Sequence, residues 1–401
     1  MRSRLQEAIG NGKKNALIKK KIFTHYINNG NTTLTALAKS LGLSVPTTTK
    51  FVDELCSDGF IQAYGKLETN GGRHPLLYGL KPDSGYFIGV DVKHFTLSIG
   101  IIDLNGVFVD QQLDIKYKFE NSPAGLDLIC DEILAFINTL DIDHDKILNI
   151  NVNISGRVNP KAGYSYSYFN FSERPLTELL EERLGYPISI DNDTRAMTYG
   201  EYTCGVVKSQ KNVLFINVSW GLGMGIIIDG KVYLGKSGFA GEFGHIPCFN
   251  NEIMCHCGKK GCLETEVSGS ALIRKMEEHL KNGEISCLSA TFQKKGSLDM
   301  GDLITAINKE DVLCIDLIEE IGIKLGKQIA GIINVFNPEI VVVGGMLAIA
   351  GDYLLQPILT TVRKHSLNMV NKDTQITISK LAGDAGLVGS CKLSRAHLFE
   401  Q

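Results

Sequence analysis

Three cysteines stand within eight residues of this chain, in the segment CHCGKKGC at positions 255–262. Thiolates bind soft and borderline metal ions, and zinc in a closed structural site takes four protein ligands in a tetrahedron. Cys255, Cys257 and Cys262 supply three of these four ligands. Redox-active thiols are the alternative, but the C-x-x-C spacing typical of them is absent and glycines shape the loop. The segment therefore predicts a structural zinc site that needs one more ligand.

Candidates for the fourth ligand lie upstream of this segment. His245 stands ten residues before Cys255 in the sequence AGEFGHIPC, which ends at Cys248. His256 stands between two cysteine ligands, and we expect it to point away from the ion. We take His245 as the fourth ligand, while geometry alone leaves Cys248 open as an alternative.

The remaining composition bounds the setting of this site. A chain of 401 residues with 44% apolar and 21% charged residues forms two or three globular domains and is neither disordered nor fibrous. Ten cysteines without a signal peptide favour free thiols in a reducing cytoplasm over disulfides. The most apolar stretch, residues 213–228, contains Asn217, Ser219 and three glycines, so it favours buried strands over a membrane span. We therefore expect a cytoplasmic protein without a membrane anchor.

Charge is distributed unevenly along the chain, although the net charge is only −3. Residues 1–81 hold 12 Lys and Arg against five Asp and Glu, whereas the remaining residues hold 29 against 39. A basic first fifth joined to an acidic body indicates that the first part meets a polyanion. A merely solvated basic face is the alternative.

The first 81 residues show the pattern of a winged helix-turn-helix. Apolar spacing predicts helices over residues 15–30, 33–42 and 45–60, with Gly42 in the tight turn and Ser44 capping the third helix. In that third helix, Val45, Val52 and Leu55 are expected to face the core. Two helices around a glycine turn, followed by a polar-faced helix, are typical of a DNA-binding unit with its recognition helix.

Base and phosphate contacts are expected from two places in this unit. Thr47, Thr49 and Lys50 would face outward from the recognition helix and reach base edges. Two apolar strands after Gly59 flank a glycine-rich turn with Arg73, which predicts a wing suited to a narrow minor groove. A small helical bundle that mediates protein contacts is the alternative. Helix order, wing and charge together favour operator DNA as a partner.

Beyond Lys81 the pattern is α/β and partly repeats itself. The segments GIIDLNGVF at 100–108 and GIIIDGKVY at 225–233 are alike, and each follows a strand. Such duplication favours two similar lobes with a cleft between them. We predict a DNA-binding domain at residues 1–81 and a first lobe at 82–190 that is completed by a C-terminal helix at about 380–401. A second lobe at 191–379 contains the predicted metal ligands, in the segment 245–262 that is called the metal loop below.

Several motifs together resemble the ROK family, which contains bacterial sugar kinases and sugar-responsive repressors. They are GEFGHIPC…CHCGKKGCLE, DNDTRAMTYGE, GGM and DAGLVG, and the similarity extends over nearly all of residues 82–401. The winged helix ahead of them resembles the repressor branch of that family. The resemblance implies an actin-like, ribonuclease-H-like pair of lobes with sugar bound in the cleft.

The resemblance also implies which side chains hold the sugar. Asn192 and Asp193 match the pair that binds sugar hydroxyls, and the aspartate is the catalytic base in the kinases. Glu242 and His245 match the Gly-Glu-x-Gly-His motif, and Glu264 matches the glutamate two positions after the last cysteine. His245 would then contact zinc through one ring nitrogen and a hydroxyl through the other.

The phosphate-binding motifs of the kinase branch are altered in this chain. Kinases of this family carry Asp-x-Gly-Gly-Thr in the first lobe, whereas this chain keeps Asp91 and has Lys93 and His94 in place of the glycines. In the second lobe Leu222 replaces the threonine of Gly-Thr-Gly. Phosphoryl transfer depends on positioning and electrostatics, so we expect no kinase activity and a vestigial role for Asp193. Arg195 also departs from the family pattern, which leaves the identity of the sugar open.

These observations predict a sugar-responsive transcriptional repressor that binds operator DNA as a homodimer or homotetramer, because two recognition helices must reach two half-sites. Sugar would act as effector by binding two conformations with different affinity. One alternative is an ATP-dependent sugar kinase of the hexokinase or N-acetylhexosamine kinase type with an attached DNA-binding domain. A second is a sugar-sensing partner of a transport protein.

Overall fold

The computed structural model describes residues 5, 14–67 and 74–399 of the chain. These residues form two compact units, one of residues Met1–Asn192 with Ser390–Gln401 and one of Asp193–Gly389. The domain boundaries predicted from the sequence stay predictions, because this division groups the winged helix with the first lobe. Within the described ranges, no helix combines the length and apolar character that crossing a membrane requires.

Over residues 14–67 and 74–80, the winged helix has three helices and a small antiparallel sheet of order β1-β3-β2. Its elements are α2 (Lys14–Asn29), β1 (Thr32–Thr33), α3 (Leu34–Leu41), α4 (Val45–Ser57), β2 (Ile61–Lys66) and β3 (Leu76–Leu80). Hydroxyl caps begin both short helices, since Thr33 Oγ1 accepts from the N–H of Ala36 and Ser44 Oγ from the N–H of Thr47. Gly42 has a φ of 64°, which the turn between them requires. The predicted helix-turn-helix is therefore confirmed.

One core prediction for the recognition helix α4 is wrong. Val45 is 43% exposed, whereas Val52 and Leu55 are buried as expected, together with Thr48. Side chains of a helix point toward its N-terminus, so the first residue of α4 points past the packed turns. Phe51 occupies the core face instead and is buried.

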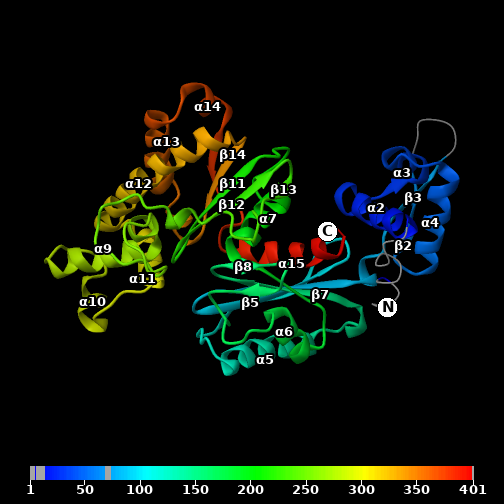
Figure 1. Ribbon diagram of the computed structural model, residues 1–401, viewed down its shortest axis with the longest axis horizontal. Helices are drawn as coiled ribbons and strands as arrows, with labels where there is room; N and C mark the ends of the chain where they lie inside the picture. The colour runs from blue at the N-terminus through cyan, green and yellow to red at the C-terminus, as the bar shows by residue number, and fades with distance from the viewer. Residues whose placement is uncertain (1–4, 6–13, 68–73, 400–401) are drawn as a thin grey trace. The chain divides into compact units, whose positions relative to one another are not determined.

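Two five-stranded sheets with the same topology form the body of the protein (Figure 1). In the first unit the order is β6-β5-β4-β7-β10, and in the second it is β13-β12-β11-β14-β15. Each sheet has two antiparallel pairings followed by two parallel ones. The first set of strands is β4 (Tyr86–Val92), β5 (Thr96–Asp103), β6 (Phe108–Lys116), β7 (Ile147–Ile154) and β10 (Ile188–Asn192); the second is β11 (Val213–Val218), β12 (Leu222–Ile228), β13 (Lys231–Val232), β14 (Ile340–Gly344) and β15 (Gln375–Ile378). The duplication inferred from GIIDLNGVF and GIIIDGKVY thus extends to the whole sheet.

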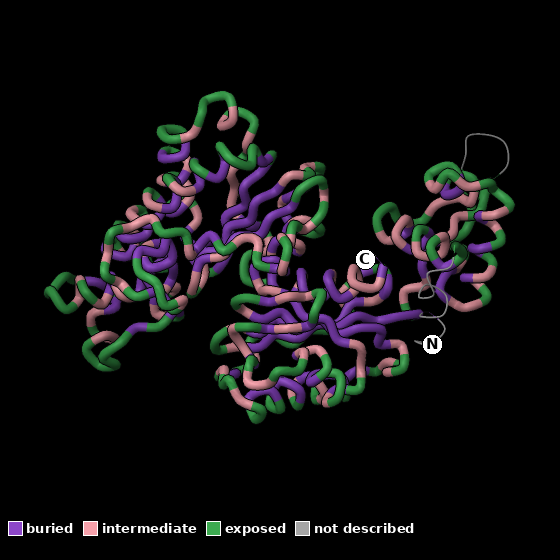
Figure 2. Tube along the Cα trace, in the orientation of Figure 1, coloured by how far each residue is buried: buried purple, intermediate pink, exposed green. Residues whose placement is uncertain are grey.

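Helices cover these sheets and bury their central strands, which Figure 2 shows as continuous buried traces. In the first unit, α5 (Pro123–Thr139) and α6 (Leu176–Leu184) pack on the sheet, and β8 (Val158–Asn159) pairs with β9 (Tyr164–Ser165). The second unit contains α7 (Asp193–Cys204), α8 (Glu264–Val267), α9 (Gly269–Lys281), α10 (Ser289–Lys295), α11 (Met300–Asn308), α12 (Val312–Phe336), α13 (Asp352–His365) and α14 (Asn368–Asp373). Both α/β lobes and the winged helix agree with the predicted fold class.

The last helix, α15 (Ala385–Phe399), starts in the second unit and ends in the first. At its start the backbones approach closely, since a Cβ on Gly389 would lie 1.8 Å from the carbonyl oxygen of Ala196 in α7. At its end Phe399 stacks on Phe23 of α2 with ring centroids 4.9 Å apart, and its carbonyl accepts from Thr24 Oγ1 at 3.1 Å. Within the second unit the start of α15 thus packs on α7, and within the first unit its end packs on α2.

Candidate functional site

The four predicted metal ligands come together in the second unit. The liganding atoms of His245, Cys255, Cys257 and Cys262 all lie within 4.8 Å of one another. Cys255 Sγ is 3.5 Å from His245 Nδ1, and Cys257 Sγ is 3.6 Å from Cys262 Sγ. Ligands of a tetrahedral zinc ion with ordinary bond lengths lie about 3.5–3.8 Å apart. Three thiols and one imidazole at this spacing could hold a metal ion.

Glycine turns give the metal loop this shape. Gly258 and Gly261 both adopt positive φ, and a Cβ on Gly261 would lie 2.2 Å from the carbonyl oxygen of Phe249. Cys248 donates its N–H to the Gly261 carbonyl at 2.8 Å, and its side chain packs against the hydrophobic core of the unit. The group of clustered liganding atoms contains His245 and does not contain Cys248, both of which the structure describes.

The thiols of the metal loop differ in acidity. Burial raises the pKa of the Cys255 thiol to about 12. Burial also acts upward on Cys257, but the N–H of Lys259 and the neighbouring thiols outweigh it and lower the pKa of Cys257 below its ordinary value. Because cysteine binds metal as thiolate, a metal ion bound here would have to displace at least the proton of Cys255.

Glu264 lies beside the metal loop, where α8 begins, and its carboxylate is held at both oxygens. Oε2 accepts from the N–H of Leu222 at 2.8 Å, and Oε1 lies 2.8 Å from His256 Nδ1. Burial would raise the pKa of Glu264, but the bonds from His256 and Leu222 outweigh it and lower that pKa. His256, expected merely to point away, is thus turned onto the predicted sugar ligand. No sequence pattern signals this contact.

The other predicted sugar ligands lie at element ends. Glu242 precedes the short helix Phe243–His245, with its Oε2 at 3.6 Å from His245 Nε2. Asn192 ends β10 in the first unit and donates from Nδ2 to the Gly156 carbonyl at 2.9 Å. Asp193 begins α7 in the second unit, where its Oδ1 accepts from the N–H of Thr194 at 2.7 Å. The second unit therefore contains Asp193, Glu242, His245 and Glu264, all of which carry acceptors suited to sugar hydroxyls.

Replacements at the phosphate motifs are engaged in other contacts. Lys93 Nζ lies 3.9 Å from Asp91 Oδ2 and 3.8 Å from Asp114 Oδ1, and the ring of His94 meets Phe95 edge-on. The side chain of Leu222 is buried in the apolar core of the second unit. These side chains occupy the positions where the kinase motifs have glycines and a hydroxyl.

Arg195 is buried and donates from NH1 to the carbonyl of Gly238 at 2.6 Å. Gly238 lies four residues before Glu242, in the loop that leads to the predicted metal ligand His245. The residue that departs from the family pattern therefore holds the backbone next to the predicted sugar ligands.

The predicted DNA-contacting residues of α4 are partly accessible. Lys50 is exposed, while Thr47 and Thr49 are half-buried. Thr47 also lies 2.8 Å from the cap Ser44, hydroxyl to hydroxyl. Arg73 lies outside the described residues.

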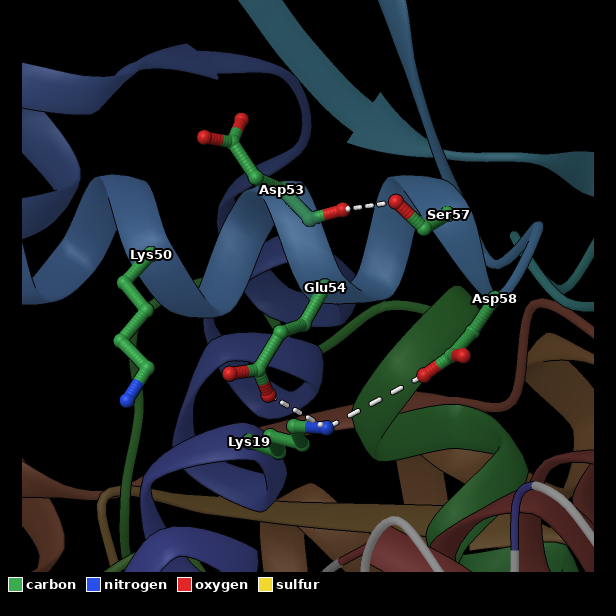
Figure 3. Close-up of a pocket in the computed structure, with 6 residues that line it drawn as sticks. All are labelled: Lys19, Lys50, Asp53, Glu54, Ser57 and Asp58. Carbon is green, nitrogen blue, oxygen red and sulfur yellow. Dashed lines mark hydrogen bonds and ion pairs between the residues drawn. The ribbon is translucent and has the colours of Figure 1, made fainter.

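A shallow polar pocket borders Lys50 on the same helix (Figure 3). Lys19 of α2 pairs there with Glu54 at 2.9 Å and with Asp58 at 3.9 Å, whereas no dashed line joins Lys50 to these residues (Figure 3). Lys19 thus braces α2 against α4, a contact that the sequence reading missed.

Comparison with known proteins places these features in context. A family model described as "ROK family" matches residues 88–397, and one described as "Winged helix-turn-helix DNA-binding" matches residues 17–62. A glucokinase from Halalkalibacterium halodurans is 31% identical over 312 residues, which cover 76% of this chain and 93% of that protein. A xylose repressor from Bacillus subtilis is 25% identical over 366 residues, which cover 91% of each.

Among solved structures, a ROK family transcriptional regulator described as a homolog of the E. coli MLC protein superposes with a TM-score of 0.81. It is 26% identical and the match covers 96% of both chains. The matches to the repressor and to this regulator are longer than the ROK segment alone, so they include the winged helix. The glucokinase match is the length of the ROK body.

Proposed function

The chain belongs to the ROK family, and because it joins a winged helix-turn-helix to the ROK body we propose that it is a sugar-responsive, DNA-binding transcriptional repressor. The observation that carries this proposal is the similarity to a xylose repressor and to a ROK regulator over nine-tenths or more of the chain. Its winged helix binds operator DNA, and its effector is a sugar or sugar derivative. Such a regulator works in the cytoplasm, where its operator lies.

We assign effector binding to Asn192, Asp193, Glu242, His245 and Glu264. Carboxylates, an amide and an imidazole offer paired acceptors and donors to adjacent hydroxyls. The bonds that Glu264 receives from Leu222 and His256 fix its orientation before a sugar arrives. Pre-organised polar groups of this kind raise affinity because less is lost on ordering.

The ion at the metal loop is proposed to be zinc, held by His245, Cys255, Cys257 and Cys262. The donor set fits zinc because three thiolates and one imidazole form a common closed structural site. A zinc ion there fixes the loop that joins Glu242 and His245 to Glu264. The role is structural, since all four positions are filled by protein.

Signal transfer to DNA is assigned to α15. Asp193 begins α7, and α7 packs closely on the start of α15 near Gly389. The end of α15 packs on α2 through Phe399 and Phe23. A sugar that binds two states of the second unit with different affinity would shift α15 and the winged helices it contacts.

DNA contacts are assigned to Thr47, Thr49, Lys50 and Arg73, and the working form is a homodimer or homotetramer, because paired half-sites need two recognition helices about one helical turn apart or a multiple of it. The test is a footprint on promoter fragments, beginning with that of the gene itself, with and without each sugar of a panel. The proposal predicts a protected pair of half-sites whose occupancy one sugar changes. No protection of any promoter fragment would contradict it.

A sugar kinase with an attached DNA-binding domain is the second candidate, favoured by the similarity to a glucokinase and by the retained Asp193. Lys93 and His94 argue against a kinase, because they stand where the kinases have two glycines. Without these glycines the backbone cannot approach a phosphate closely. A coupled ATP assay over the same sugar panel separates the two candidates. Turnover at ordinary kinase rates would favour the kinase.

A further inference from the structure

A cluster of five charged side chains lies beside the metal loop, outside the ligand set, and one of them, Arg274, has NH2 4.0 Å from Glu266 Oε1. Glu266 of α8 forms ion pairs with two lysines: its Oε2 lies 2.7 Å from Lys324 Nζ of α12 and 3.4 Å from Lys275 Nζ of α9. Glu320, one turn before Lys324, lies 2.7 Å from Lys324 Nζ and 2.8 Å from Lys275 Nζ. The side chains of Glu266 and Lys275 are only 12% and 11% exposed. The cluster thus ties the short helix α8 to two longer helices.

The metal loop itself is attached to this cluster at two points between His245 and Cys255. Asn251 Nδ2 donates to Glu266 Oε1 at 2.9 Å, and Asn251 Oδ1 accepts from the N–H of Ile253 at 3.3 Å. Lys324 Nζ lies 5.6 Å from the ring centroid of Phe249. The carbonyl of Gly261 in turn accepts from the N–H of Phe249 at 3.1 Å. One attachment of the loop therefore comes from Lys324 of α12, and the other comes from Glu266 of α8, which Lys324 pairs with.

Physical chemistry explains why this attachment is firm. A carboxylate that is nearly buried needs cations and hydrogen-bond donors to stay charged, and removing one partner leaves the other uncompensated. Burial would raise the pKa of Glu266, but Lys324, Lys275 and Asn251 outweigh it and lower that pKa. The 25-residue helix α12 is anchored along its length in the core of the unit, so Lys324 is a fixed point.

We propose that Glu266 and Lys324 are positioning residues that hold the metal loop in its ion-binding shape from outside the ligand set. The inference rests on the proposed metal site. Because Glu264 stands two residues before Glu266 on the same short helix, the same anchor also orients the predicted sugar ligand. Loops that are ordered before they bind lose less entropy on binding, so the anchor raises the affinity for zinc.

The test measures zinc affinity of the full-length protein by competition with a chromophoric chelator, well below the melting temperature. We expect E266Q and K324M each to bind zinc at least about tenfold more weakly, as loss of groups that orient ligands does elsewhere. The double variant should lose little more than either single variant, because both break one interaction. The control is K295M, which removes an exposed lysine paired with Asp299 and Asp302 in the same unit and should leave the affinity unchanged.

Affinities of E266Q and K324M within twofold of the unchanged protein would overturn the inference. A purely stabilising role would lower the melting temperature of the metal-free protein without weakening zinc competition, which also counts against it. If E266Q does not fold, K324R and K324M decide instead, since K324R should retain affinity and K324M should lose it. If the protein without substitutions binds no zinc, the proposed metal site itself is wrong. That result differs from one in which the protein binds zinc and neither substitution weakens the binding, which contradicts only the present inference.

Discussion

Two regions of this chain differ in how closely they follow the pattern of the kinases in the family. At the metal loop, His245 lies among three thiols, and Glu264 accepts hydrogen bonds at both carboxylate oxygens. At the turn after β4, two glycines have given way to Lys93, which pairs with Asp91 and Asp114, and to His94. The proposed sugar-binding region keeps the polar residues of the family pattern, whereas the turn after β4 has side chains at the two positions where that pattern has glycines.

Under the proposed function, this difference explains how the same fold can serve a sugar kinase or a sugar sensor. Hydroxyl recognition depends on side chains whose positions a metal loop can fix, and those side chains remain. Phosphate recognition by a glycine turn depends on backbone that approaches the ligand without a Cβ, so two side chains suffice to abolish it. Binding and turnover can therefore be separated by changes at one turn.

The largest expected effect is at the metal loop, in Cys257→Ser. We expect this variant to lose zinc and all measurable sugar binding together, because the loop joins His245 to Glu264. Metal content by mass spectrometry and a thermal-shift titration with the effector check this. Loss of zinc with full sugar affinity would break the link between metal and pocket.

Next in size is Glu264→Gln, which keeps an acceptor for the N–H of Leu222 and removes the charge. Sugar affinity should fall about ten- to a hundredfold, since hydrogen bonds to charged groups contribute about 1.5–3 kcal/mol. Calorimetric titration measures it. Asp114→Asn, in β6 and paired with Lys93 of the altered turn, is the matched control and should change affinity less than twofold; equal losses in both variants would remove the distinction between the regions.

A third prediction concerns how the sugar-binding region reports to DNA. Phe399 is 1% exposed and lies against Phe23 and Phe87, so Phe399→Ala should lower the free energy of unfolding by about 3 kcal/mol. The variant should still bind sugar while its operator affinity no longer responds to it. Denaturant unfolding and operator titrations with and without sugar check both parts. An intact response would mean that the signal takes another route.

Smallest of all is the effect expected from opening the phosphate turn with Lys93→Gly and His94→Gly together. Effector-dependent operator binding should stay within about twofold of the unchanged protein, because neither residue belongs to the proposed sugar site. Gel-shift titrations measure this. A large loss would show that the altered turn takes part in sensing.

Much of this architecture could be predicted from the sequence because its signals are local. The helix-turn-helix is predicted by Ser44, Gly42 and the apolar spacing around Val52. The repeated sheet is predicted by the similarity of residues 100–108 to residues 225–233. The spacing of the three cysteines likewise predicts that they gather, with His245, into a group that could hold a metal ion.

What the sequence did not reveal depends on contacts between distant residues. Val45 is exposed because it is the first residue of α4. The apolar spacing of a sequence does not fix where a helix starts to within one residue, so it does not predict this exposure. The turn of His256 onto Glu264 and the attachment of Asn251 to Glu266 join loops and helices whose mutual placement no pattern encodes. Arg73 lies outside the described residues, so its DNA contact stays a prediction.

Operator binding titrated with the sugar that stabilises the protein most is the measurement that bears most directly on this account. The account predicts that the sugar shifts operator affinity at least about tenfold while it is recovered unphosphorylated from a reaction containing ATP. An operator affinity that the sugar leaves unchanged, together with stoichiometric conversion to sugar phosphate, would contradict it.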